Sequence, residues 1–230
     1  GKKIETAVVD IAVGGKAVPE GSIGIYEEVL SLLNLKNNSK VDIILARKPL
    51  SIEFIKKKLD GKRLTKKEID QIVWDIVHNK LSESELTYFV AACYTNLMSM
   101  EETIMLTKAI ANHGDILKFN KYPIIDKHCI GGIPGNRTTM ILVPIIAAAG
   151  LTIPKTSSRS ITSPAGTADT MEVLAKVTFP IQKMKQIIQK TNGCIVWGGS
   201  LNLAPADDKI INVEKTLEID AESQLHASIM

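Results

Sequence analysis

The sequence contains few cysteines, and none of them is spaced as a metal-binding pair. Its 230 residues include three cysteines, Cys93, Cys129 and Cys194, and no Cys-x-x-Cys pair. An odd, widely spaced set argues against both a zinc site and a disulfide framework. Free cysteines are typical of a reducing compartment, so we expect a cytoplasmic protein that holds no metal.

Long apolar runs and a strong net charge are also missing. The longest apolar run, residues 140–151, is too short to cross a bilayer and contains Pro144. The formal net charge is +3 and the lysines are scattered, which does not indicate nucleic acid. We therefore expect neither a membrane nor a nucleic acid as partner. An apolar fraction of 45% and a charged fraction of 23% are those of an ordinary globular protein.

Strand-like segments predominate near the N-terminus. Residues 6–13 end in a double glycine that is typical of a hairpin turn, and residues 40–47 form a second strand candidate. Residues 24–33 fit a short helix between them. Pro49 marks a boundary, because the residue before a proline is pushed to extended conformations. We predict a small strand-rich domain over residues 1–48.

The following stretch has a helical pattern up to about residue 112. Three of its segments open with a capping box, in which a hydroxyl residue and a glutamate three positions later satisfy free backbone N–H groups. These pairs are Thr65 with Glu68, Ser82 with Glu85, and Ser99 with Glu102. The apolar stripes behind them indicate packing rather than chemistry. We interpret Trp74, His78 and Cys93 as structural. They lie in residues 49–115, which we predict to be the first part of a helical domain.

Strands alternate with helices from residue 122 onward, which predicts an α/β domain with a mostly parallel sheet over residues 116–200. Its strand candidates are residues 123–125, 151–153 and 193–197, and its helix candidates are residues 139–149, 167–174 and 181–191. We expect the tail, about residues 201–230, to return to the helical domain and make that domain discontinuous. The tail stops without a helix cap, so we expect an incomplete α/β domain and a longer protein.

Two loops of small and polar residues follow the first two strand candidates. Residues 127–132 read Lys-His-Cys-Ile-Gly-Gly, and residues 157–163 contain five Ser/Thr hydroxyls and Arg159. A strand, a small-residue loop and a helix start together favour an anion, because free N–H groups and the helix dipole meet there. Two such sites indicate a ligand with more than one phosphate-like group. The alternative for the first loop is a tight turn before a capped helix.

Four segments together resemble the thymidine phosphorylase family of nucleoside phosphorylases, and most closely its archaeal branch. They are residues 127–132, residues 157–159, residues 165–169 with Glu172, and residues 201–207. The resemblance implies a pentosyltransferase that uses inorganic phosphate as co-substrate and needs no cofactor. It also implies a homodimer or larger homo-oligomer, and a family protein roughly twice this length.

The archaeal branch implies nucleoside 5′-monophosphates as substrates: AMP, and CMP or UMP as further candidates. Phosphorolysis would yield the free base and ribose 1,5-bisphosphate. The resemblance implies that Asp220 is the proton donor and that phosphate is held by Lys127, Thr139 and Ser157. It also implies substrate contacts by Gly132, Ser158, Arg159, Ser160, Ile161, Thr162, Ser163, Thr167 and Ser228. From the residues alone, His128, Asp207 and Asp208 are rival acids.

Three positions depart from the family pattern. Cys129 stands where the family usually has serine, and a thiol donates a weaker hydrogen bond to phosphate. Val213 replaces an arginine, and Ser163 a histidine, of the nucleoside-specific members. The last two changes favour a nucleotide over thymidine. The alternatives are a thymidine or pyrimidine-nucleoside phosphorylase, and an inactive fragment that binds phosphate or nucleotide.

Overall fold

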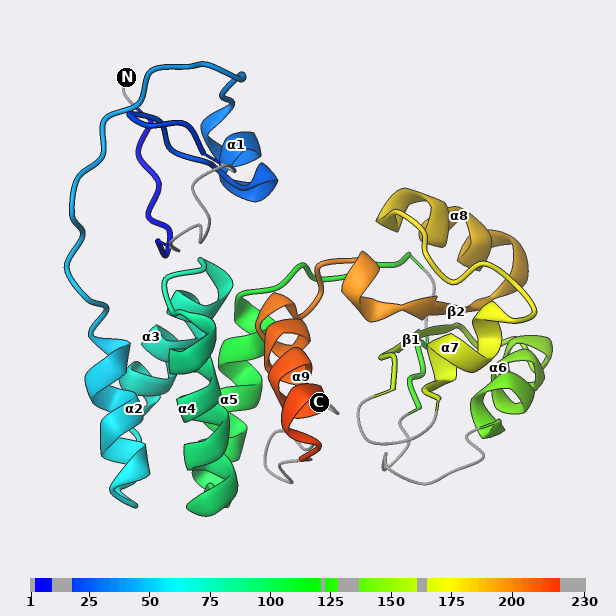
Figure 1. The fold of residues 1–230 in the computed structure, drawn as a ribbon. Helices are drawn as coiled ribbons and strands as arrows, with labels where there is room; N and C mark the ends of the chain where they lie inside the picture. Colours follow the sequence, from blue (N-terminus) through cyan, green and yellow to red (C-terminus); the bar gives the residue numbers. More distant parts are fainter. Residues whose placement is uncertain (1–2, 10–17, 121–122, 128–136, 161–164, 220–230) are drawn as a thin grey trace.

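A helical bundle and an α/β unit stand side by side, with an N-terminal segment beyond one end of the bundle (Figure 1). The structure is a computed structural model. It describes residues 3–9, 18–120, 123–127, 137–160 and 165–219. No helix in these ranges is long and apolar enough to cross a membrane.

The N-terminal segment has one described helix, α1 (Glu27–Leu33). The strands predicted at residues 6–13 and 40–47 are corrected: residues 6–9 and 40–47 have no regular secondary structure, and residues 10–13 lie outside the described ranges. Ile43, Ile44 and Leu45 are 68%, 83% and 98% exposed. An apolar sequence favours extended chain, but a strand also needs a hydrogen-bonded partner.

The bundle contains five helices of the described chain, which share one apolar core. They are α2 (Ser51–Leu59), α3 (Lys66–Val77), α4 (Glu83–Thr95), α5 (Met100–Asn112) and α9 (Pro205–Leu217). All three predicted capping boxes are present, and they open α3, α4 and α5. Helix α9 packs against α3, α4 and α5 and contributes Ala206, Ile210 and Val213 to the core. A segment that follows the α/β unit in sequence therefore completes the bundle.

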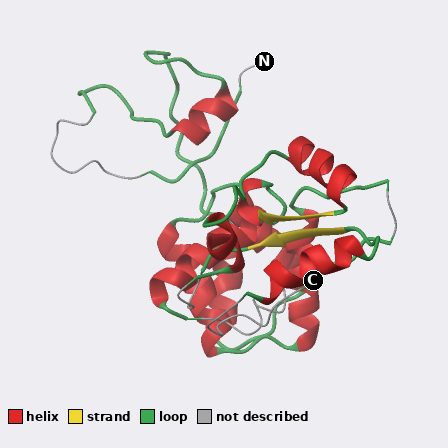
Figure 2. Cartoon of the chain, turned by 90° about the vertical axis from the view of Figure 1, so that its right-hand side faces the viewer, coloured by secondary structure: helices red, strands yellow, loops and turns green. Residues whose placement is uncertain are grey.

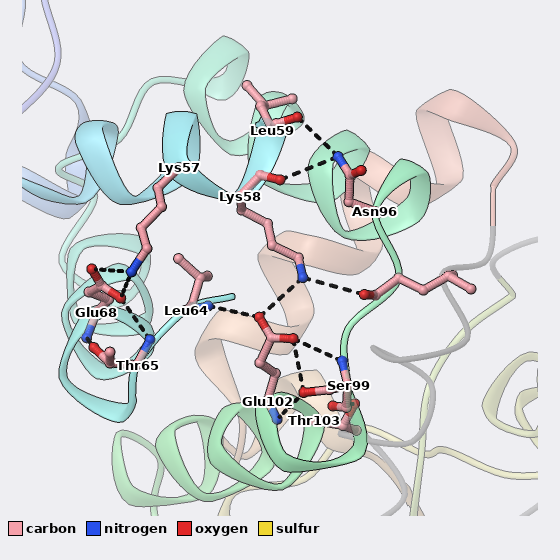
Figure 3. A network of polar contacts seen from close by, with 11 residues as sticks. Lys57, Lys58, Leu59, Leu64, Thr65, Glu68, Asn96, Ser99, Glu102 and Thr103 are labelled. Atoms are coloured by element: carbon pink, nitrogen blue, oxygen red, sulfur yellow. Dashed lines mark hydrogen bonds and ion pairs between the residues drawn. The ribbon is translucent and has the colours of Figure 1, made fainter. Parts of the chain in front are cut away.

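A buried ion pair joins α2 to α5 inside the bundle (Figure 3). Lys58 and Glu102 are each 2% exposed, and the Lys58 Nζ lies 3.1 Å from Glu102 Oε1. The Glu102 carboxylate also accepts hydrogen bonds from the backbone N–H groups of Leu64 and Ser99. Burial alone would raise the pKa of Glu102, but these bonds and Lys58 hold it below its ordinary value. The pair therefore stabilises the bundle at neutral pH and loses this effect as the pH falls through the acidic range.

The α/β unit is built on two parallel strands, β1 (Ile153–Ser157) and β2 (Gly193–Trp197), which lie side by side among helices (Figure 2). Residues of β1 pair in order with those of β2, from Ile153 with Gly193 to Ser157 with Trp197. Of the strand predicted at residues 123–125, the structure has a single parallel bridge between Ile124 and Thr152. The helices are α6 (Thr138–Ala148), α7 (Thr167–Glu172) and α8 (Ile181–Thr191), and the short helix η1 (Gly198–Ser200) follows β2.

Most predicted elements of this unit are confirmed, with shifted ends. The strand predicted at residues 193–197 is β2 as expected, but the one predicted at 151–153 begins at Ile153 and continues to Ser157. Pro154 lies inside β1 opposite Cys194, although a proline usually marks the end of a strand. The extension brings Ser157 to the end of the strand.

Two chain connections between the bundle and the α/β unit touch each other. The backbone N–H of Asp115 donates to the carbonyl of Asn202 at 3.0 Å. A Cβ atom at Gly114 would lie 1.8 Å from the carbonyl oxygen of Leu203, so only glycine fits there. The segment that leaves the bundle and the segment that returns to it are thus held together at residues 114–115 and 202–203.

We expect Glu102→Ala to destabilise the bundle by about 3–5 kcal/mol, because it leaves Lys58 buried without its partner. The measurement is urea unfolding followed by circular dichroism. Glu53→Ala is the matched control, since its ion pair with Lys56 is exposed and such pairs contribute about 1 kcal/mol or less. Equal, small effects of both substitutions would contradict a stabilising role for the buried pair.

Candidate anion-binding site at the carboxyl edge of the sheet

The parallel pairing brings three chain ends to one edge of the sheet. Residues 125–127 follow the bridge at Ile124, residue 158 follows β1, and residue 198 follows β2. Parallel strands end on the same side, and ligands of open α/β sheets bind in the crevice outside these carboxyl ends. Both predicted phosphate loops therefore start from the same edge.

Lys127 and Thr139, two of the predicted phosphate-binding residues, are in contact. The Lys127 Nζ donates to the Thr139 Oγ1 at 2.6 Å. Lys127 is half-buried at the sheet edge, whereas Thr139 is fully buried in the first turn of α6. A cation and a hydroxyl thus lie together at the start of an 11-residue helix. Such an arrangement favours an anion, because the helix dipole and free N–H groups add to the charge of the cation.

Lys155 is a second cation near this position, and the sequence analysis missed it. It lies on β1, is 4% exposed, and its Nζ is 3.5 Å from Asp126 Oδ1. A buried lysine needs a compensating negative charge or a ligand. The available signal was a lysine between the apolar run at residues 151–153 and the hydroxyl-rich loop.

The second loop is described at residues 157–160 and again from residue 165. Ser157 ends β1, and its hydroxyl donates to the carbonyl of Ser158 at 3.2 Å. Ser158 is exposed, while Thr167 is 4% exposed as the first residue of α7. The predicted residues of this loop therefore differ in their access to a ligand.

The charge of Arg159 is balanced within the protein. Its guanidinium donates to Asp169 at 2.7 Å and to both oxygens of Glu172 at 2.6 and 3.1 Å. It also lies 4.9 Å from the centre of the Trp197 ring. The hydrogen bonds that the guanidinium donates to Glu172 and Asp169 raise the pKa of Arg159 above its ordinary value. The contact of Arg159 with a substrate stays a prediction.

Several predicted site residues lie outside the described ranges. They are the proposed acid Asp220, the rival acid His128, Cys129, and the predicted substrate contacts Gly132, Ile161, Thr162, Ser163 and Ser228. Among the described rivals, Asp208 lies in the first turn of α9, and burial raises its pKa above the ordinary value. Val213 packs in the bundle core.

The described side chains offer no thiol nucleophile. Burial raises the pKa of Cys93 to about 12, and it does the same for Cys194. A thiol is reactive as its thiolate, so both are inert near neutral pH. In the described ranges, no group of three or more His, Cys, Asp or Glu residues is placed to hold a metal ion.

Two family models match the chain, one for each unit of the fold. Residues 52–114 match the helical bundle domain of a glycosyl transferase family, and residues 121–223 match the a/b domain of the same family. The match to both domains agrees with the two units of the structure.

Curated relatives with about half of their residues identical are named AMP phosphorylase. The one from Methanococcus vannielii is 51% identical over 213 residues, which are 93% of this chain and 42% of that protein. The one from Pyrococcus furiosus is 51% identical over 216 residues, or 94% of this chain and 43% of that protein. The chain thus spans less than half the length of these relatives.

A solved structure shares the fold at low sequence identity. Anthranilate phosphoribosyltransferase from Thermus thermophilus superposes with a TM-score of 0.63 and 19% identity, over 76% of this chain and 54% of that one. At this identity the likeness concerns the fold alone.

Proposed function

Since the chain belongs to the glycosyl transferase family whose helical bundle and a/b domains it contains, we propose that it is part of an enzyme that phosphorolyses AMP. The observation that carries the proposal is 51% identity, over 93% of the chain, to a protein named AMP phosphorylase. In the proposed reaction, AMP and inorganic phosphate give adenine and ribose 1,5-bisphosphate. The reaction is a pentosyl transfer and needs no cofactor.

The proposed chemistry requires a held nucleophile and an acid. A phosphate oxygen bonds to the anomeric carbon of the ribose, the bond from that carbon to the base breaks, and its electron pair leaves with the base. Holding phosphate close and in line lowers the barrier, and Lys127 with Thr139 supplies two donors for it. Ser157, at the end of β1, is the third proposed phosphate contact. We assign Asp220 as the acid that protonates the departing base.

The second loop is proposed to bind the 5′-phosphate of the nucleotide. Ser158 is exposed at the carboxyl edge of the sheet, and Thr167 follows at the start of α7. A phosphate takes several donors at once, which suits a loop rich in hydroxyls and N–H groups. The same phosphate is present in CMP and UMP, so these nucleotides are further candidate substrates. A nucleoside such as thymidine lacks it.

We also propose that the enzyme works as a cytoplasmic homo-oligomer joined through the bundle. Apolar side chains gather near the turn between α4 and α5. Tyr94, Leu97 and Met100 are 52%, 69% and 69% exposed. Exposed apolar side chains that gather in one region are typical of an interface between protein chains.

The substrate preference of the full-length protein tests the proposed function. We expect phosphate-dependent release of adenine from AMP with a kcat/KM about ten- to a hundredfold above that for adenosine. The reason is that each hydrogen bond to a charged group contributes about 1.5–3 kcal/mol. The kcat/KM values for AMP, CMP, UMP, adenosine and thymidine are measured by chromatography of the released base. Turnover of thymidine as fast as AMP would replace the proposal with a nucleoside phosphorylase.

The phosphate position is tested by Lys127→Ala in the same protein. We expect the KM for phosphate to rise about tenfold or more, because a charged donor to the nucleophile is lost, while the KM for AMP changes much less. Initial rates at varied phosphate and varied AMP separate the two effects. Lys183→Ala, an exposed lysine on α8, is the control and should change neither KM. Equal rises in both KM values for Lys127→Ala would count against the assignment.

A further inference from the structure

We propose that Asp169 is a positioning residue that sets the conformation of residues 158–160 and thereby the preference for a 5′-phosphate. The proposal rests on the function proposed above. Asp169 is the third residue of α7, and its carboxylate accepts three hydrogen bonds from two separate chain segments.

The three bonds tie the second loop closed at both described ends. One carboxylate oxygen accepts from the Arg159 guanidinium at 2.7 Å. The other accepts from the backbone N–H of Ser160 at 2.8 Å and from that of Gly166 at 3.0 Å. The chain leaves this carboxylate at Ser160 and returns to it at Gly166. Asp169 therefore fixes the position of Arg159 and Ser160, the two residues that follow Ser158.

The negative charge of Asp169 suits a residue that orients the loop and not one that contacts a phosphate. Burial alone would raise its pKa, but hydrogen bonds from Gly166, Ser160 and Arg159 hold the pKa below its ordinary value. The group is thus an ionised acceptor at neutral pH, and an ionised carboxylate repels a phosphate. It can favour binding of the 5′-phosphate only through the donors that it orients.

Arg159 also helps to hold residues 158–160 in place. Glu172 and Asp169 both pair with its guanidinium, so the three side chains together carry one net negative charge. The Trp197 ring, at the end of β2, lies on the guanidinium and anchors it to the sheet. Besides Arg159, this segment offers a phosphate the hydroxyls of Ser158, which is exposed, and of Ser160, which is half-buried, together with backbone N–H groups.

A glycine allows the two segments to touch. A Cβ atom at Gly166 would lie 2.7 Å from the carbonyl carbon of Arg159 and 2.8 Å from the backbone nitrogen of Ser160. Backbone therefore packs on backbone at the point where the Asp169 carboxylate bonds both. The contact is independent of the charges and indicates the same fixed conformation.

Asp169→Asn in the full-length protein tests the proposal. The amide keeps the shape but has one acceptor oxygen, so its NH₂ group must face either the guanidinium or two backbone N–H donors. We expect kcat/KM for AMP to fall about tenfold or more, with that for adenosine and the KM for phosphate changed less than about twofold. Glu172→Gln is the matched control, because Glu172 contacts the same guanidinium but neither of these backbone N–H groups; a change below about threefold is expected.

Two further measurements separate positioning from general stability. Asp169→Glu keeps the ionised group and should recover part of the AMP activity, which tests the proposal if Asp169→Asn does not fold. Equal losses with AMP and adenosine, or an unchanged AMP activity in Asp169→Asn, would overturn the proposal. A wild-type enzyme without AMP phosphorolysis would refute the proposed function instead. In that case calorimetry of AMP binding decides, and equal Kd values for wild type and Asp169→Asn would overturn the role of Asp169.

Discussion

The parallel register of β1 and β2 is the constraint on which the rest of the site depends. Pairing of Ser157 with Trp197 ends both strands at the same level, and the bridge at Ile124 brings Lys127 to the same edge. Arg159, two residues beyond β1, can then lie on the Trp197 ring. A slip by one residue would turn alternate side chains to the opposite face. It would move Lys155 out of its buried position and separate the two loops.

The helical bundle anchors the chain segments that connect it to the α/β unit. The buried pair of Lys58 and Glu102 links α2 to α5, and α9 returns from the α/β unit to fill the same core. The two connections touch at Gly114, where no larger residue fits. Because the proposed acid Asp220 follows α9 in sequence, the packing of α9 on the bundle also determines where the chain leaves for residue 220.

Local rules predicted much of the fold, and long-range contacts account for most of what was missed. The capping boxes at Thr65, Ser82 and Ser99 are local, and all three helices begin where they predict. Lys127 and Thr139 were both predicted as phosphate contacts, and the structure places them in contact with each other. Residues 40–47 form no strand, because strand formation depends on a partner elsewhere in the chain.

The Arg159 cluster shows why a residue type alone does not define a ligand contact. An arginine in a hydroxyl-rich loop predicted a contact with phosphate, which stays a prediction, but it did not reveal the partners Asp169 and Glu172, which lie 10 and 13 residues further along the chain. They meet it only after α7 has folded back on the sheet edge. The sequence contains all three charges, and their pairing depends on a backbone approach that Gly166 permits.

A crystal structure of the full-length protein with AMP and sulfate, which stands in for inorganic phosphate, tests the account most directly. The account predicts two separate anions at the carboxyl edge. Sulfate would contact the Lys127 Nζ and the Thr139 hydroxyl, and the 5′-phosphate of AMP would bind residues 158–160 with the Arg159–Asp169 pair intact. A 5′-phosphate bound at Lys127, or an Arg159 released from Asp169 to bind it, would contradict the account.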